Sequence, residues 1–160
     1  MKVCVFAGTF EPFTVGHEQI VRKCIEKFDK VYVVIGKNPN KQSLLTDAEK
    51  LEIISACFCG ANVCVVAYSQ IADYSKFLKE KGITVYVRGI RDDKDLEFER
   101  KMEKENLKLY PFIQTEYVYA DLPFKEVSST LVRQKIANGE SVAHLIPSAC
   151  LDLTLKYLKD

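Results

Sequence analysis

The chain has 160 residues, 48% of them hydrophobic and 28% charged, a composition that fits one globular domain spanning residues 1–160 with a sizeable core. A formal net charge of +1 argues against a general attraction to nucleic acid or to anionic membranes. No apolar run approaches the roughly 20 residues of a membrane-spanning helix, and the N-terminus lacks the pattern of a signal peptide. We therefore expect a cytoplasmic protein with no nucleic-acid partner and no membrane partner.

Strand-like and helix-like segments alternate along the chain. In chain order the sequence predicts a strand at 2–7, a helix at 17–28, a strand at 30–36, a helix after the capping box at 46–49, a strand at 62–67, a helix at 73–80, a strand at 84–88, a charged helix at 92–109, a strand at 115–119, and helices at 131–137 and 148–158. The first three strands are nearly continuous apolar runs, as in parallel sheets buried on both faces. The pattern predicts an α/β fold, a Rossmann-like doubly wound five-stranded parallel sheet in a single domain. In such sheets, ligands bind outside the carboxyl ends of the strands.

Six cysteines, at positions 4, 24, 57, 59, 64 and 150, form no C-x-x-C pair. Cys4 and Cys64 lie in strand-like runs, and Cys24 lies among apolar residues of a predicted helix. Neither histidine is near Cys57, Cys59 or Cys64 in the sequence. We expect buried, reduced thiols rather than a metal site.

The segment GTFEPFTVGH at residues 8–17 connects the first predicted strand to the first predicted helix. We expect Thr9 and His17 at opposite ends of one turn, with His17 at or near the helix N-terminus. A helix start suits phosphate oxygens, and an imidazole there can donate a hydrogen bond to a phosphoryl group whose charge rises during reaction. We expect Gly8 to allow a tight turn and Gly16 a close backbone approach to a ligand. A glycine-rich turn after a strand is also common without any phosphate ligand.

Basic side chains follow two later strands. Lys41 lies in NPNKQ at 38–42, where it is either a phosphate ligand or a solvated loop lysine. In RGIR, Arg88 and Arg91 can point into one crevice and bind phosphate oxygens bidentately, while Gly89 frees the backbone to approach a ligand. Arg91 can instead pair with an acidic residue at 92, 93 or 95.

Hydroxyl and carboxylate side chains gather near these arginines and at a later helix start. Residues 128–130 place three hydroxyls at the helix start, more than one N-cap requires. They form either a redundant cap or a second cradle for phosphate or nucleotide. Asp95 and Glu99 share a helix face with Arg91, and this face can order the arginine and touch a ribose or amine.

Four segments, in their order and spacing, resemble the bacterial phosphopantetheine adenylyltransferases: GTFEPFTVGH at 8–17, NPNK at 38–41, RGIRDDKDLEFE at 88–99 with Asn106 beyond it, and VSSTLVR at 127–133. The first segment resembles the T/H-x-G-H signature of the nucleotidyltransferase superfamily, with Glu11 where that signature usually has Asp. The segment at 88–99 points to this family rather than to cytidylyltransferases. The resemblance runs over nearly the whole chain.

The resemblance implies an enzyme that transfers AMP reversibly from ATP to 4′-phosphopantetheine, giving dephospho-coenzyme A and pyrophosphate in coenzyme A biosynthesis. Mg²⁺ is the implied cofactor, and its protein ligands stay unassigned because Mg²⁺ usually arrives held by phosphates. On this interpretation the protein positions the reactants and stabilises charge, and it supplies no nucleophile.

The resemblance also implies roles for matching residues. Catalytic roles fall to Thr9, His17, Lys41 and Arg91, with His17 stabilising the transition state. ATP binding falls to Thr9, Phe10, His17, Gly89, Ile90, Arg91, Glu99, Phe124, Lys125, Glu126, Val127, Ser128, Ser129 and Thr130. Binding of phosphopantetheine falls to Thr9, Lys41, Ala72, Arg88 and Asn106.

The family is typically a homohexamer, so the resemblance implies a homo-oligomer. The apolar residues that follow or end the charged helix serve either such an interface or the core: Leu107, Leu109, Tyr110 and Phe112.

The chain departs from the family pattern near the nucleotide and acceptor sites. The departures are Phe98 for Tyr, Tyr119-Ala120-Asp121 for a Met-Pro-Ser type turn, Lys125-Glu126 for a Ser-Phe type pair, and Thr130 for Ser. Two alternatives stay open: a related nucleotidyltransferase with a different phosphorylated acceptor, and a nucleotide-binding module without catalysis. The intact set of basic and phosphate-binding residues argues against the second.

Overall fold

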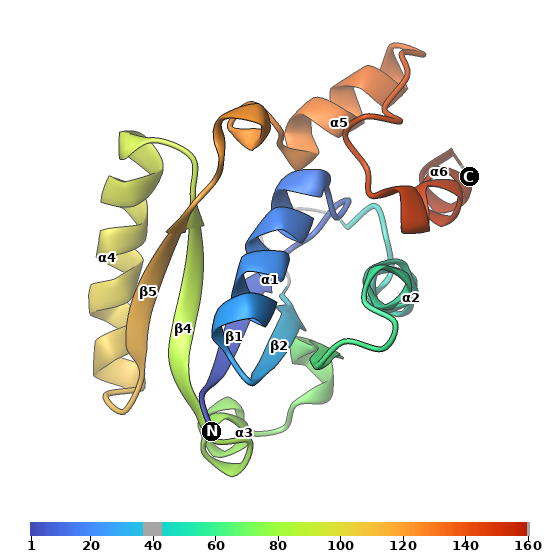
Figure 1. Cartoon of the computed structure of the whole chain (residues 1–160). Coiled ribbons are helices and arrows are strands. Elements are labelled where there is room, and N and C mark those ends of the chain that lie inside the picture. The colour runs from blue at the N-terminus through green and yellow to red at the C-terminus, as the bar shows by residue number, and fades with distance from the viewer. Residues whose placement is uncertain (37–42, 160) are drawn as a thin grey trace.

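The computed structural model describes residues 1–36 and 43–159, which fold around a five-stranded parallel sheet (Figure 1). The strand order is β3-β2-β1-β4-β5. The strands are β1 (Val3–Gly8), β2 (Lys30–Ile35), β3 (Val63–Ala67), β4 (Ile83–Ile90) and β5 (Gln114–Tyr119). The chain starts in the middle of the sheet, builds one half and then returns to build the other, so the prediction of a Rossmann-like doubly wound sheet is confirmed.

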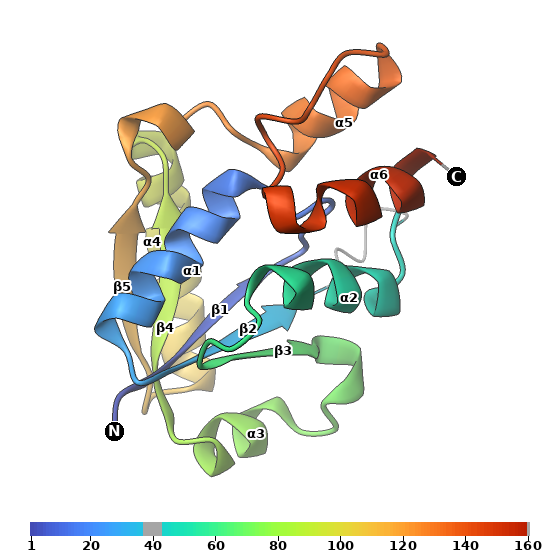
Figure 2. The same cartoon turned by 45° about the vertical axis from the view of Figure 1, so that its right-hand side comes forward.

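Six α-helices in the described residues cover both faces of this sheet (Figures 1 and 2). One face carries α1 (Val15–Lys27) and α2 (Asp47–Cys57), with α5 (Ser129–Ala137) and α6 (Leu151–Lys159) beyond them; the other carries α3 (Tyr74–Glu80) and α4 (Asp93–Leu109). Three short 3₁₀ segments, Tyr68–Gln70, Leu122–Phe124 and Ser148–Cys150, complete the described elements. Within residues 1–36 and 43–159, every helix falls short of the length and apolarity that a membrane crossing requires.

The strands supply both hydrophobic cores, because successive side chains of a strand point to opposite faces. On β1, Cys4 and Phe6 pack in the core beneath α1 and α2, whereas Val3 and Val5 pack with Leu78 of α3 in the other. Burial on both faces explains why the central strands read as unbroken apolar runs.

Side-chain caps fix where the helices begin. Thr46 forms the predicted capping box with Glu49, and Ser128 caps α5. Helix α1 begins two residues earlier than predicted, because Thr14 is its N-cap. The predicted last helix is divided: a 3₁₀ turn at Ser148–Cys150 precedes α6.

All six cysteines are free thiols. Four are buried as predicted, namely Cys4, Cys24, Cys57 and Cys150. The prediction of burial was wrong for Cys59, which lies in an exposed turn after α2, and Cys64 is only half-buried on an edge strand.

Candidate active site

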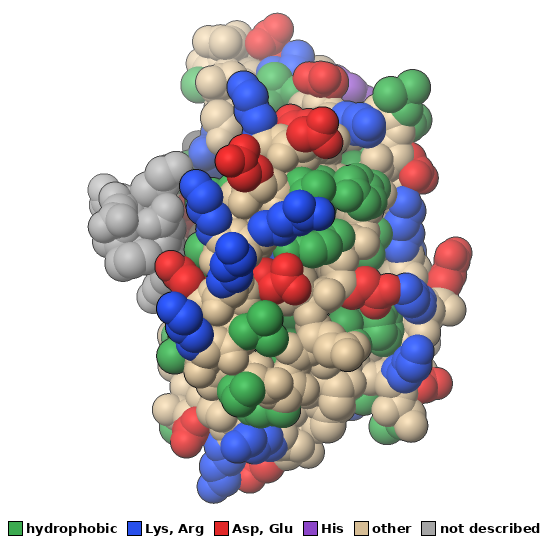
Figure 3. Space-filling view, turned by 90° about the vertical axis from the view of Figure 1, so that its left-hand side faces the viewer, with side chains coloured by type: hydrophobic (Ala, Val, Ile, Leu, Met, Phe, Trp, Pro, Cys, Tyr) green, Lys and Arg blue, Asp and Glu red, His purple; other side chains and the backbone are tan. Residues whose placement is uncertain are grey.

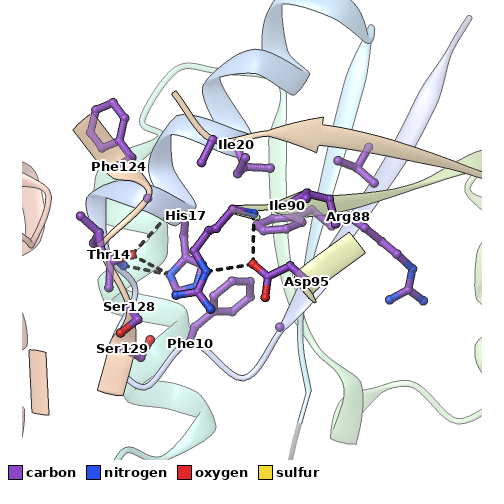
Figure 4. A pocket seen from close by; sticks show the side chains of 18 of the residues that line it. Phe10, Thr14, His17, Ile20, Arg88, Ile90, Asp95, Phe124, Ser128 and Ser129 are labelled. Atoms are coloured by element: carbon purple, nitrogen blue, oxygen red, sulfur yellow. Dashed lines mark hydrogen bonds and ion pairs between the residues drawn. The ribbon is translucent and has the colours of Figure 1, made fainter. Parts of the chain in front are cut away.

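A cavity of about 360 Å³ lies at the carboxyl ends of β1 and β4, where this type of sheet places its ligands (Figure 4). Its lining combines apolar side chains, which suit a nucleobase, with polar side chains and helix starts, which suit phosphates. The apolar group includes Ile20, Val87, Ile90, Ala120 and Phe124; the polar group includes His17, Arg88, Arg91, Asp95, Glu99, Ser128, Ser129 and Thr130.

His17 occupies the first turn of α1, and the helix cap fixes its protonation (Figure 4). The backbone N–H of Thr14 donates to His17 Nδ1 at 3.0 Å, and Thr14 Oγ1 accepts from the His17 backbone N–H at 3.3 Å. This is a capping box with histidine in place of the usual Glu or Gln. Because Nδ1 accepts from a backbone N–H, the neutral ring carries its hydrogen on Nε2. His17 thus offers a single N–H donor to the cavity.

The surroundings of His17 keep its ring uncharged. Burial, reinforced by the positive charge of Arg91, lowers the pKa of His17 from 6.5 to about 4. Phe10 meets the ring edge-on with 5.0 Å between centroids, and Phe13 stacks on it at 5.4 Å. At neutral pH the side chain is therefore a hydrogen-bond donor without a charge.

Gly8 has a different role from the predicted one, whereas Gly16 lines the cavity, where the prediction places a close backbone approach to a ligand. The residue with a left-handed backbone is Phe10, with φ of 50°, and neither Gly8 nor Gly16 has a positive φ. A Cβ at Gly8 would lie 2.9 Å from the Phe10 ring, so Gly8 makes room for that buried ring. A Cβ at Gly16 would meet only ordinary contacts. Gly89 similarly makes room for Ile20, whose Cγ1 would lie 3.2 Å from an added Cβ.

Glu11, the residue that departs from the family signature, anchors this loop to α2. Its Oε1 lies 3.1 Å from Nζ of Lys50, whose side chain is only 1% exposed. The same oxygen accepts from the backbone N–H of Leu44 at 3.0 Å. Burial alone would raise the pKa of Glu11, but Lys50 and the N–H donors outweigh it and lower the pKa. The carboxylate therefore ties the loop at 8–17 to the segment that leads into α2.

Arg91 both pairs with an acidic residue and lines the cavity. Asp95 Oδ2 accepts from the backbone N–H of Arg91 at 3.0 Å and from its Nε at 3.1 Å. Pairing with an acidic residue and facing the ligand are therefore compatible for Arg91, since Asp95 orders an arginine that still lines the cavity.

Arg88 is largely buried, with 10% of its side chain exposed. Its Nη1 pairs with Glu99, and its guanidinium lies over the ring of Tyr86, 4.6 Å from the centroid. In the described part of the chain, its buried Nε has no hydrogen-bond partner. A buried N–H without an acceptor is unfavourable, so this atom is suited to an acceptor on a ligand.

The three hydroxyls at the start of α5 have different partners. Ser128 Oγ accepts from the backbone N–H of Leu131 at 3.1 Å and is the N-cap. Ser129 Oγ donates to the Pro12 carbonyl at 2.7 Å, and Thr130 Oγ1 accepts from Arg133. A single residue suffices as the cap, and all three line the cavity. The N-termini of α1 and α5 therefore meet at one site.

The structure brings most of the predicted ATP-binding residues into the cavity lining: Phe10, His17, Gly89, Ile90, Arg91, Glu99, Phe124, Val127, Ser128, Ser129 and Thr130, together with Arg88 from the predicted acceptor site. Thr9, Lys125 and Glu126 are exposed residues beside it. Ala72 is exposed just before α3, and Asn106 lies on α4 about 10 Å along the helix from Glu99. Lys41 lies outside the described residues.

Some lining residues were not predicted as site residues. Thr14 is one, and the spacing Thr-x-x-His, which imitates a capping box, was the signal for it. Ile20, Tyr86 and Ala120 also line the cavity. In sequence Ile20 and Tyr86 look like ordinary core residues, and no local signal marks them, whereas Ala120 belongs to the turn at 119–121 that departs from the family pattern.

Metal ligands are not evident in the side-chain arrangement. Across residues 1–36 and 43–159, no group of three or more His, Cys, Asp or Glu side chains is placed to hold a metal ion. No metal ligand is therefore assigned to the protein.

Comparison with known proteins places the chain among nucleotidyl-transferring enzymes. The profile of the cytidylyltransferase-like family matches residues 5–135. A phosphopantetheine adenylyltransferase from Levilactobacillus brevis is 34% identical over 92% of this chain and 91% of its own length. One from Petrotoga mobilis is 33% identical, over 98% of this chain and 95% of its own. One from Actinobacillus pleuropneumoniae is 35% identical over 92% of each.

A solved structure supports the fold assignment. A Vibrio parahaemolyticus protein assigned as a nicotinate-nucleotide adenylyltransferase superposes with a TM-score of 0.71, covering 100% of this chain and 98% of that one. At 18% identity the likeness concerns the fold alone.

The sheet, the cavity at its carboxyl edge and the sequence matches define this chain as a nucleotidyltransferase, an enzyme of the α/β class. It belongs to the cytidylyltransferase-like family and, within that family, to the phosphopantetheine adenylyltransferases.

Proposed function

We propose that residues 1–160 form one catalytic domain that transfers AMP from ATP to 4′-phosphopantetheine, giving dephospho-coenzyme A and pyrophosphate in coenzyme A biosynthesis. The observation that carries the proposal is identity of 33–35% to phosphopantetheine adenylyltransferases across more than nine tenths of both chains. The convergence of the predicted ATP-binding residues on one cavity supports it. We propose that the reaction takes place in the cytoplasm.

The proposed chemistry needs no base from the protein. A phosphate oxygen of 4′-phosphopantetheine attacks the α-phosphorus of ATP, and the bond from that phosphorus to the β-phosphate oxygen breaks as pyrophosphate leaves. The attacking phosphate is already anionic at neutral pH, so catalysis consists of alignment and charge stabilisation.

We assign His17 the stabilisation of charge on the α-phosphate. Its Nε2–H is held by the Thr14 cap and points from the N-terminal turn of α1, where the helix dipole adds positive potential. A fixed donor needs no reorganisation as charge develops, and removing one such donor typically costs about 10²–10³ in rate. We assign Arg91, Lys41 and Thr9 to the same phosphate region.

The two substrates occupy different parts of the site in this proposal. The ATP phosphates bind at Arg91 and the N-terminus of α5, and the adenine base binds against the apolar lining near Phe124. Further contacts to ATP come from Phe10, Gly89, Ile90, Glu99 and residues 125–130. Phosphopantetheine accepts a hydrogen bond from the unpaired Nε of Arg88. Its further contacts are assigned to Thr9, Lys41, Ala72 and Asn106.

We propose that Mg²⁺ accompanies the ATP phosphates as substrate-bound metal, which matches its preference for few protein ligands. It would neutralise phosphate charge when bound.

We also propose a homo-oligomer, a hexamer as in the family. The side of the molecule that carries α4 shows apolar patches among charged groups of both signs (Figure 3). On α4, Phe98 is 61% exposed, Leu107 44% and Leu109 66%. Tyr110 and Phe112 instead pack against the core beside α3.

Pyrophosphate release tests the proposed reaction. The assay contains ATP and Mg²⁺ with or without 4′-phosphopantetheine, and CTP replaces ATP in parallel. We expect release that requires both ATP and phosphopantetheine. Bound ATP without release would mean a different acceptor. A His17→Ala variant that loses ATP binding and turnover equally would indicate a binding module.

A further inference from the structure

The segment from Tyr119 to Phe124 contributes to the apolar lining of the cavity, and side chains of another element hold it in place. It leaves the edge strand β5, passes through Ala120 and reaches Phe124, and both of these residues line the cavity. Asp121 and Leu122 between them are exposed. The position of this lining therefore depends on contacts to another element.

Those contacts come from α1, about a hundred residues earlier in the chain. Gln19 Nε2 donates to Asp121 Oδ2 at 2.5 Å, and Gln19 Oε1 accepts from the Asp121 backbone N–H at 3.1 Å. Lys23 Nζ donates to Asp121 Oδ1 at 2.9 Å and to the Tyr119 carbonyl at 2.8 Å. We name Gln19, Lys23 and Asp121 the wall clamp. Both carboxylate oxygens and two backbone groups are engaged, which gives more geometric definition than a single exposed ion pair.

The wall clamp connects the segment to the helix that carries His17. Gln19 and Lys23 lie one turn apart on α1, and Ile20 between them lines the cavity. The residue before Asp121 is held by β4, because the backbone N–H of Ala120 donates to the Ile90 carbonyl at 2.8 Å. The clamp therefore sets how far the apolar lining at 120–124 lies from α1 and from the strand end at Ile90.

We propose that Asp121, with Gln19 and Lys23, is a positioning residue that shapes the nucleobase side of the ATP site. The inference rests on the proposed function for the identity of the nucleotide. The clamp touches neither His17 nor Arg88, so it acts on nucleotide binding and leaves phosphoryl transfer and acceptor binding unchanged. Asp121 belongs to the turn at 119–121 that departs from the family pattern, so this chain builds that side of its site with its own side chains.

The chain contains a matched control for this proposal. Lys27 and Glu116 form an ion pair between α1 and β5, the strand that leads into the segment of Asp121, and Lys27 lies one helical turn beyond Lys23. Its side chains are 56% and 30% exposed, compared with 34% and 61% for Lys23 and Asp121. A purely structural role would make the two pairs equivalent.

The test compares Asp121→Ala and Lys23→Met with Glu116→Ala in the full chain. We measure kcat, the KM values for ATP and phosphopantetheine, the Kd of ATP by calorimetry, and thermal stability. We expect both clamp variants to raise the KM and Kd of ATP about tenfold, which is the factor for ~1.4 kcal/mol, with kcat and the phosphopantetheine KM unchanged. Glu116→Ala is expected to match the wild type in all four. Asp121→Asn keeps one acceptor oxygen and is expected to fall between wild type and Asp121→Ala.

Three results would overturn the proposal: an unchanged ATP Kd in both clamp variants, an effect in only one of them, or an equal rise in Glu116→Ala. Calorimetry of ATP binding needs no turnover. A wild-type protein that binds ATP without consuming phosphopantetheine would therefore count against the proposed function while the clamp is still tested.

Discussion

Acidification should destabilise the folded protein, because the site around His17 disfavours the protonated, charged imidazole. The folded protein holds the pKa of His17 at about 4, against 6.5 in the unfolded chain, because the enclosed ring loses hydration and lies near the positive charge of Arg91. Between these values the unfolded state binds a proton that the folded state does not. The free energy of unfolding is therefore highest above pH 6.5 and falls as the pH drops toward 4.

The size of the effect follows from the two pKa values. At about 1.4 kcal/mol per pH unit, the contribution of His17 falls by about 2 kcal/mol between pH 6.5 and 5, and by about 3 kcal/mol by pH 4. Urea unfolding of the wild type and His17→Gln across this range isolates it, because glutamine keeps an acceptor for Thr14 but does not titrate. The stability of the wild type relative to the variant should decline by these amounts.

Nuclear magnetic resonance gives the direct check. The chain has two histidines, and His144→Gln assigns the remaining ring signals to His17. We expect the His17 ring to stay neutral at pH 6, with the chemical shifts of the Nε2-protonated tautomer. A His17 signal that titrates at or above pH 6.5, or an Nδ1-protonated tautomer, would refute the account of the Thr14 cap.

Three further predictions concern substitutions in and near the site. His17→Ala should lower kcat about 10²–10³-fold while the Kd of ATP rises less than about threefold, measured by turnover and calorimetry; equal losses would contradict the assigned role. Lys50→Met should lower the free energy of unfolding, measured by urea denaturation, by about 2 kcal/mol, because it leaves the largely enclosed carboxylate of Glu11, 14% exposed, without its ion partner. The exposed control Lys76→Met should cost less than about 0.5 kcal/mol, and equal costs would contradict this reasoning. Arg88→Lys should raise the KM for phosphopantetheine about tenfold and leave the KM for ATP unchanged, because lysine lacks the Nε donor; a reversed pattern would place Arg88 on ATP.

The fold could be predicted from the sequence because its signals are local. Continuous apolar runs such as 30–36 indicate strands buried on both faces, and the capping box at 46–49 marks a helix start. The hydrophobic pattern places the start of α1 two residues late, because the cap is Thr14 with a histidine in place of the usual Glu or Gln. Boundaries thus depended on side-chain hydrogen bonds that the hydrophobic pattern does not contain.

The site could be predicted only where its residues lie in recognisable segments. His17, Arg91 and Ser128 fall in such segments, and they meet in one cavity. The partner of Glu11 is Lys50, which looks like an ordinary polar residue in its helix, and its burial depends on how α2 packs. The turn at Asp121 was visible as a departure, but its partners lie about a hundred residues away, a distance that no local pattern spans.

The hydrogen bond from the Thr14 backbone to the His17 ring constrains positions 14 and 17, which lie three residues apart, in different ways. The donor that sets the histidine tautomer is a backbone N–H, which every residue except proline supplies. Serine at position 14 would keep the hydroxyl of the cap as well. Position 17 has no such freedom, because only a histidine there accepts this N–H on one ring nitrogen and presents the hydrogen of the other to a phosphate. Natural variants should accordingly carry a small capping residue such as Thr or Ser at 14, never proline, and histidine alone at 17.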